Sequence, residues 1–159
     1  MTDKIQQAKE LLEKEGYKII AKNEISEDGL LEIPELSTEE YTFKLEINVH
    51  DKNKSWDELG LSEREDELLT AEQVLFLMNS KYAKELKMDG SSSNDDFFIK
   101  QYSDLSKANG YVAYFFADSW CSYLGSYEYS GVAYSDRGVR FVKKVPKNRI
   151  KGKVVNKLK

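Results

Sequence analysis

The sequence predicts an α+β fold in which a small antiparallel sheet near the C-terminus is flanked by helices. Three patterns indicate this class. Residues 41–49 and 138–142 alternate between apolar and polar side chains, as half-buried strands do. Residues 70–86 begin with a capping box and then repeat apolar positions with the 3.6-residue period of a helix. Residues 111–134 are rich in aromatic residues at strand-like spacing. Because the alternating runs at 41–49 and 138–142 require strands, neither an all-helical nor a parallel α/β fold is expected.

Elements expected before residue 70 are one helix and two strands. The helix spans residues 3–15 and ends at Gly16, and a short strand follows over 17–21. The strand over 41–49 is the clearest in the chain, because apolar and polar residues alternate without a break. His50 falls at the end of its polar face, so we expect this histidine to be exposed.

The helix that begins at Thr70 is expected to run to Leu86, with Gln73 completing the capping box. We expect its apolar side to pack against neighbouring strands of the sheet. The expected contacts join Val74, Leu77 and Met78 of the helix to Phe115 and Phe141. The remaining elements expected are a polar loop over 88–96, a short helix over 97–105, and strands over 111–116, 122–129, 132–134 and 138–144.

Size and composition are those of one domain with small extensions. The chain has 159 residues, of which 40% are hydrophobic and 33% charged, so a disordered chain is not expected. No apolar run reaches the ~20 residues of a spanning helix, and the charged start is unlike a signal peptide, so we expect synthesis in the cytoplasm. The expected divisions are a helix and strands over 1–55 that can be integral to the fold, a domain over 56–144, and a basic tail over 145–159.

The scarcity of histidine and cysteine limits the chemistry that is open to this chain. The lone Cys121 excludes an intramolecular disulfide and a multi-cysteine zinc site. The lone His50 excludes a histidine-rich metal centre and leaves little basis for a histidine-dependent triad. The three carboxylates of residues 88–96 are more typical of a polar loop than of a cation site. We therefore expect no catalytic residues, no metal and no cofactor.

Charge divides the chain into an acidic body and a basic tail. Residues 1–142 hold 16 Lys and Arg against 28 Asp and Glu, a balance of −12, whereas residues 143–159 hold 8 Lys and Arg and no acid. The tail is typical of a solvated extension, or of a contact with nucleic acid. The alternative function is thus a nucleic-acid-associated accessory protein, which requires the cations from Lys147 to Lys159 to lie on the same face as the tyrosines. The acidic body makes nucleic acid an unfavourable partner.

The aromatic segment 111–134 has two interpretations that composition leaves open. Nine of its 24 residues are aromatic, against 19 in the whole chain, and serine and glycine lie between them. In residues 111–116 the aromatic residues occupy both parities, so their rings point to both faces of a strand. Either the strand is buried on both faces, or one face is an exposed aromatic surface similar to an antibody paratope.

A family resemblance is carried by three runs taken in order: ELLTAEQVLFLMNSKYAKELKMDG, DFFIKQYSDLSKANGYVAYFFADS and SDRGVRFVKK. Over about residues 60–144 they resemble the variable proteins of diversity-generating retroelements, most closely those of archaeal viruses. The resemblance implies a C-type lectin-like fold whose C-terminal stretch is rewritten when template codons AAY become NNY. Such codons never encode Trp, Glu, Lys, Met or Gln, and residues 114–135 depart from this pattern only at Trp120 and Glu128.

The resemblance also implies a ligand-binding display protein that is not an enzyme. Its expected target is a macromolecule, most simply a cell-surface protein, and association with a virion is an implied location. The chain lacks the calcium motif of sugar-binding C-type lectins, so no metal is expected in binding. The frame is expected to include Val112, Ala113, Phe115, Leu124 and residues 138–142. Tyr114 and Phe116 are expected to share one strand face, as are Tyr127 and Tyr129. The expected ligand-binding residues are Tyr114, Phe116, Asp118, Trp120, Tyr123, Tyr127, Tyr129 and Tyr134. All of them except Asp118 are expected to form one contiguous, largely solvent-accessible patch.

Overall fold

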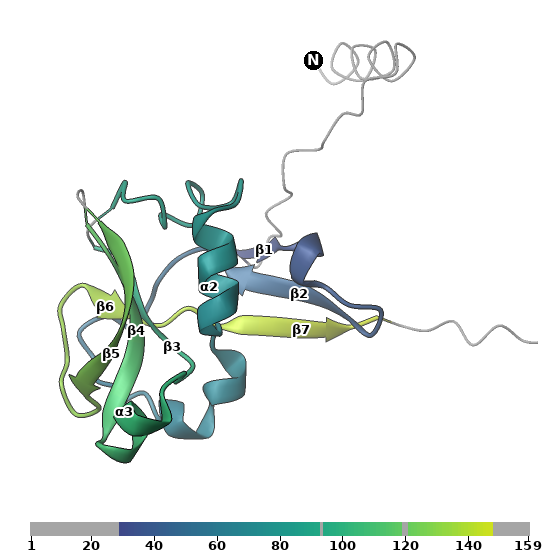
Figure 1. Ribbon diagram of the computed structural model, residues 1–159. Coiled ribbons are helices and arrows are strands. Elements are labelled where there is room, and N and C mark those ends of the chain that lie inside the picture. Colours follow the sequence, from purple (N-terminus) through teal and green to yellow (C-terminus); the bar gives the residue numbers. More distant parts are fainter. Residues whose placement is uncertain (1–28, 93, 119–120, 148–159) are drawn as a thin grey trace, which may run out of the picture.

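The computed structural model describes residues 29–92, 94–118 and 121–147, which form two β-sheets with a helix between them (Figure 1). The three-stranded sheet has the order β1-β2-β7 and the four-stranded sheet has the order β5-β4-β3-β6. The fold is therefore α+β, as the sequence predicts. The expected helix over 3–15, the strand over 17–21 and the end of the basic tail lie outside the described residues. The strands are β1 (Leu30–Glu32), β2 (Tyr41–Glu46), β3 (Asp96–Ile99), β4 (Tyr111–Ala117), β5 (Ser122–Tyr129), β6 (Arg137–Gly138) and β7 (Val142–Pro146), and the α-helices are α2 (Ala71–Met78) and α3 (Asp104–Ala108).

The three-stranded sheet joins the early part of the described chain to its end. Leu45 of β2 is opposite Leu31 of β1 and Val142 of β7, and both pairings are antiparallel. The alternating pattern predicts this strand correctly, since Phe43 and Leu45 are fully buried. Regular pairing nevertheless ends at Glu46, four residues before His50.

His50 is half-buried and not exposed as expected, because two carboxylates hold its ring. Nε2 lies 2.7 Å from a Glu46 oxygen and Nδ1 lies 2.8 Å from an Asp51 oxygen. Burial lowers the pKa of His50, but the hydrogen bonds to Asp51 and Glu46 outweigh it and raise the pKa above its ordinary value. The backbone of His50 also bridges to Val139, which ties the loop after β2 to the segment before β7.

Helix α2 begins as predicted, but it is shorter than expected. The Thr70 hydroxyl accepts a hydrogen bond from the Gln73 N–H, and the Gln73 side chain accepts one from the Thr70 N–H, which completes the capping box. The helix ends at Met78 and does not reach Leu86. Asn79 and Ser80 donate side-chain hydrogen bonds of 2.8 Å to carbonyl oxygens of the preceding turn, and such side chains compete with continued helix.

The hydrophobic core lies on both faces of β4. On the α2 side, Val74 and Leu77 pack with Ala113 and Phe115 in one buried cluster. On the other side, Val112 and Tyr114 belong to a second cluster with Trp56, Phe98 and Val139. The aromatic residues of β4 are therefore mostly core, because both faces of the strand are covered.

Phe141 does not pack on α2, contrary to expectation. It is half-buried in the second cluster, where the Arg64 guanidinium lies 3.9 Å from the centre of its ring and His50 packs at 5.6 Å. The predicted strand over 138–144 is divided, because β6 joins one sheet and β7 joins the other. Phe141 lies between the two, so its side chain contacts the loops after β2 and does not reach the helix.

The helix expected over 97–105 is also wrong, because Asp96–Ile99 is the buried strand β3. All four residues are buried, and a strand covered on both faces has no apolar–polar alternation to identify it. Only Asp104–Ala108 is helical. The strand expected over 132–134 is absent, and β6 pairs in parallel with β3, so the sheet is not purely antiparallel. In the described part of the chain no helix is long and apolar enough to cross a membrane.

Candidate functional site

A β-bulge in β5 decides which tyrosines face the same way. Val112 is opposite Glu128 and Tyr114 is opposite Gly125, so β5 advances three residues while β4 advances two. Tyr127 lies in this bulge and packs edge-on against Tyr114, with ring centres 5.7 Å apart. Tyr129 instead packs against Tyr111 at 4.8 Å.

Tyr127 and Tyr129 consequently lie on opposite faces of the sheet. Their partners Tyr111 and Tyr114 are three residues apart on β4, and such residues point to opposite faces of a strand. The expectation that Tyr127 and Tyr129 share a face is wrong, because simple alternation does not hold across a bulge. Tyr114 and Phe116 do share a face, since both belong to the side of the second cluster.

Tyr114 is fully buried, which corrects the expectation that its ring is solvent-accessible. The ring lies directly across the backbone of Gly125 on the neighbouring strand. A Cβ atom at Gly125 would be 2.7 Å from Tyr114 Cε2 and closer still to Cζ and Oη, so the ring occupies the space of the missing side chain. The Arg137 guanidinium packs on the same ring, 3.9 Å from its centre.

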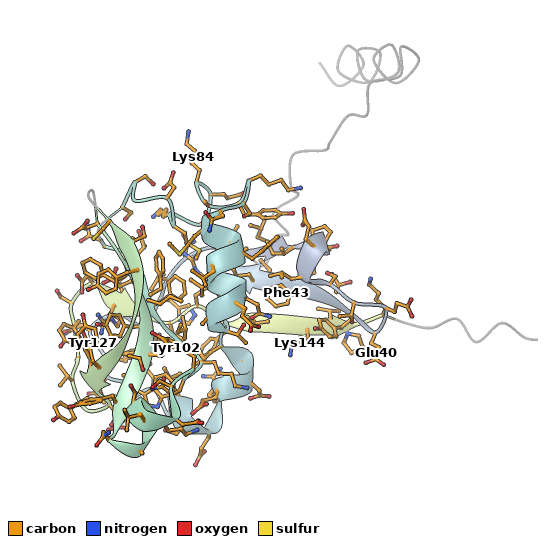
Figure 2. The ribbon with its side chains drawn as sticks, in the orientation of Figure 1. Glu40, Phe43, Lys84, Tyr102, Tyr127 and Lys144 are labelled. Atoms are coloured by element: carbon orange, nitrogen blue, oxygen red, sulfur yellow. The ribbon has the colours of Figure 1, made fainter. Side chains whose placement is uncertain are left out.

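Three tyrosines around this buried ring remain exposed. The exposed fractions are 38% for Tyr123, 61% for Tyr127 and 36% for Tyr134. Tyr123 packs against the half-buried Phe116 at 4.9 Å, and the Tyr123 and Tyr127 hydroxyls are 3.4 Å apart. Figure 2 shows Tyr127 on the outer side of the four-stranded sheet, away from α2. We call Phe116, Tyr123, Tyr127 and Tyr134 the tyrosine surface.

The other expected ligand-binding residues do not join this surface. Tyr129 is 60% exposed, but it lies on the opposite face. Asp118 is half-buried at the end of β4, where its carboxylate accepts a 2.8 Å hydrogen bond from the Cys121 N–H. Trp120 lies outside the described residues.

Arg137 is a buried residue that packs against the tyrosines of this surface, and the sequence analysis did not identify it as part of the site. It is only 3% exposed, and its guanidinium pairs with Glu128 and lies 4.0 Å from an Asp96 oxygen. The same guanidinium lies 4.5 Å from the ring centre of Tyr134. Glu128 was one of two departures from the NNY pattern, and a fixed acid within a variable stretch is the signal that could have identified a buried ion pair.

Burial and neighbouring hydroxyls shift the pKa values of the tyrosines at this site in different directions. Burial raises the pKa of Tyr114 far above its ordinary value. The hydrogen bond to Tyr127, together with burial, raises the pKa of Tyr123 to about 12. Beneath them, burial raises the pKa of Asp96 to about 6, although its hydrogen bond from the Ala117 N–H acts in the opposite direction. The neighbouring hydroxyls of Tyr114 and Tyr123 lower the pKa of Tyr127, in the opposite direction to that of Tyr123.

The described residues near the tyrosine surface bring no nucleophile and base together. Cys121 is exposed, and slight burial together with the neighbouring Asp118 carboxylate raises the pKa of its thiol, which disfavours the reactive thiolate. Within residues 29–92, 94–118 and 121–147, no group of three or more His, Cys, Asp or Glu side chains could hold a metal ion. The interactions that this arrangement offers a ligand are aromatic contact and hydrogen bonding.

Comparison with known proteins assigns no family to the chain, since no family model, curated protein or solved structure matches it. The features that bear on function are therefore those of the site itself. They are the exposed tyrosine rings, the buried tyrosine and arginine beneath them, and the glycine that leaves room for that buried ring.

Proposed function

We propose that this chain is a ligand-binding display protein of the kind found among variable proteins of diversity-generating retroelements, with a C-type lectin-like frame. The tyrosine surface contacts a macromolecular target, most simply a protein on a cell surface, and performs no chemistry on it. The observation that carries this proposal is the group of exposed tyrosine rings that lie on a sheet beside the buried Tyr114 and Arg137.

Tyrosine is well suited to such a surface. Each ring offers a large contact area at low entropic cost, because only two side-chain torsions need to be fixed on binding. Aromatic residues and arginine also supply most of the binding energy in protein interfaces. Here Tyr123 is already positioned by contacts with Phe116 and Tyr114, at 4.9 and 6.4 Å between ring centres, so little further ordering is required.

Exposed and buried residues divide the aromatic segment into a replaceable surface and a fixed frame. Tyr114 belongs to the frame, because its ring fills the space beside Gly125 and stacks on Arg137. Glu128 belongs to the frame as the ion-pair partner of Arg137. The replaceable positions are the exposed ones, at Tyr123, Tyr127, Tyr129 and Tyr134.

The alternative function, nucleic-acid association through the basic tail, gains no support from the described residues. Lys147 is the described residue that begins the expected cluster of cations, and its ammonium group donates a 2.9 Å hydrogen bond to the Thr38 carbonyl. It directly follows β7, which extends away from β5 and the tyrosines (Figure 1). The position of Lys147 therefore does not favour one binding surface formed jointly by the basic tail and the tyrosine surface.

The DNA around the coding region tests the proposal. We expect a second copy of the stretch that encodes residues 111–142, nearly identical and differing only where the copy has adenine. The differences should fall in the codons for Tyr123, Tyr127, Tyr129 and Tyr134 and should spare those for Tyr114 and Arg137. No such repeat, or differences spread evenly over all bases, would contradict the proposal.

A further inference from the structure

The tyrosine cluster already holds one guanidinium group, that of Arg137. This group lies 3.9 Å from the ring centre of Tyr114 and 4.5 Å from that of Tyr134. Arginine suits such a place, because its planar and weakly hydrated cation stacks on aromatic rings. Tyr114 is buried, but Tyr127 and Tyr134 are 61% and 36% exposed. The kind of contact that Arg137 makes inside the protein is therefore open to a cation from outside.

A carboxylate without a cationic partner lies close to this cluster. Asp136 is half-buried and follows Tyr134 by two residues, and within the described chain its carboxylate has no hydrogen bond and no ion pair. Its negative charge instead helps to raise the pKa of the buried Asp96, whose carboxylate lies 4.0 Å from the Arg137 guanidinium. Asp136 therefore adds negative potential beside the exposed rings.

The cations of the neighbouring loop do not neutralise this potential. Lys52 and Lys54 flank Asn53, whose backbone N–H donates a 3.1 Å hydrogen bond to the carbonyl oxygen of Tyr134. Both lysines already form ion pairs with other carboxylates of the chain, at 3.2 and 2.7 Å. Residues 111–136 themselves hold three acids and neither Lys nor Arg. The exposed rings thus lie in a region of net negative charge.

We propose that the tyrosine surface binds a protein that presents arginine side chains, which stack on Tyr127 and Tyr134 and pair with Asp136. This inference rests on the proposed function, since it names the chemistry of the partner for the same surface. Arginine meets both requirements at once, because its flat guanidinium packs on a ring while its N–H groups bind a carboxylate. The acidic body also favours the approach of a basic partner.

Titration of the full chain with a tetra-arginine peptide, followed by NMR of the tyrosine ring resonances, tests this partner. We expect the resonances of Tyr123, Tyr127 and Tyr134 to shift and those of Tyr129, on the opposite face, to stay. A tetra-lysine peptide should bind about two- to fivefold more weakly, because the strongly hydrated ammonium group gains less from the rings. Equal affinity for the two peptides, or equal shifts at all exposed tyrosines, would overturn the proposal.

Tyr127→Leu and Tyr129→Leu form a matched pair of variants. The two tyrosines are 61% and 60% exposed on the same strand, and each packs against one ring of β4. Tyr127→Leu should raise the dissociation constant of the arginine peptide about two- to fivefold, as the loss of an exposed cation–π contact requires, and Tyr129→Leu should leave it unchanged. Asp136→Asn should weaken binding and reduce its dependence on salt. Equal losses in the two tyrosine variants would contradict the proposed contact.

The basic tail of the chain is a second source of arginine, and one variant distinguishes it. If Arg149→Ala shifted the Tyr127 resonance without added peptide, the tail would occupy the surface and the proposal would be overturned. The outcome is separate from the test of the proposed function. A template repeat without arginine binding would overturn this partner and leave the display function intact, whereas arginine binding without a repeat would support the partner chemistry alone.

Discussion

Replacing Gly125 with alanine should destabilise the fold through one identifiable contact. The added methyl group would be 2.7 Å from Tyr114 Cε2 and closer still to Cζ and Oη. The ring cannot easily move away, because Tyr114 is fully buried and the Arg137 guanidinium packs on the ring at 3.9 Å from its centre. Either the two strands separate locally or the ring is displaced from the arginine.

The expected cost follows from the size of this overlap. Inserting a methyl group into a packed core costs about 1–3 kcal/mol, and the smaller conformational freedom of alanine in the unfolded chain returns about 0.4–1 kcal/mol. The free energy of unfolding should therefore fall by about 1–2 kcal/mol. For a chain of this length that corresponds to a decrease in Tm of roughly 2–8 °C.

Urea denaturation of the wild type and the Gly125→Ala variant measures this loss. Gly131→Ala is the matched control, because the nearest atom to its added methyl would be an Asp57 oxygen at 3.7 Å, an ordinary contact. In the double variant Tyr114→Leu/Gly125→Ala the smaller side chain makes room, so the combined loss should be less than the sum of the single losses. If Gly125→Ala were as stable as Gly131→Ala, Tyr114 would not fill this space and the reasoning would be refuted.

Three other predictions concern the same cluster and can be measured by urea unfolding. Tyr114→Ala should lower the free energy of unfolding by about 3–5 kcal/mol, because it truncates a side chain in the core. Tyr127→Ala should lower it by about 1 kcal/mol, because only an aromatic contact is lost. Equal losses would show that both rings belong to the core. Burial raises the pKa of Asp96 in the folded state from 3.8 to about 6, so the folded state binds more protons in that interval. The stability gained from protonated Asp96 is fully present below about pH 4, and it declines by about 3 kcal/mol as the pH rises through 6. Asp96→Asn should remove this part of the pH dependence of the free energy of unfolding. If the free energies of unfolding of the variant and the wild type ran parallel over this pH range, the prediction would be contradicted. Arg137→Met leaves the carboxylate of Glu128 without its partner and should cost about 3–5 kcal/mol of unfolding free energy. Arg140→Met should cost less than ~1 kcal/mol, because the buried Arg140 has one hydrogen bond and two unpaired nitrogens. A larger loss for Arg140→Met than for Arg137→Met would refute this ranking.

Parts of the fold with a local signal could be predicted from the sequence. The capping box identified the start of α2 at Thr70, and alternation identified β2. The bounds of β5 also follow from the sequence, because Gly and Ser residues mark its surroundings. In each case the pattern reflects a half-buried element, whose two sides differ in polarity.

Features that depend on residues distant in sequence could not be predicted. Strand β3 gives no alternation, because both of its faces are buried by segments far along the chain. The burial of Tyr114 depends on Gly125 and Arg137, which come from the neighbouring strand and from β6. The bulge that turns Tyr127 and Tyr129 to opposite faces is likewise a property of the pairing between β4 and β5.

The separation of an exposed, replaceable surface from a buried frame is tested most directly by two NNY codon libraries. One randomises the codons for Tyr123, Tyr127, Tyr129 and Tyr134, and the other randomises those for Tyr114, Gly125 and Arg137. The measurement is the fraction of variants that resist protease when displayed on cells, counted by sequencing. Most members of the first library should stay folded and few of the second should. If the first library lost protease resistance as often as the second, the tyrosines would be structural and the surface could not serve as a variable binding site.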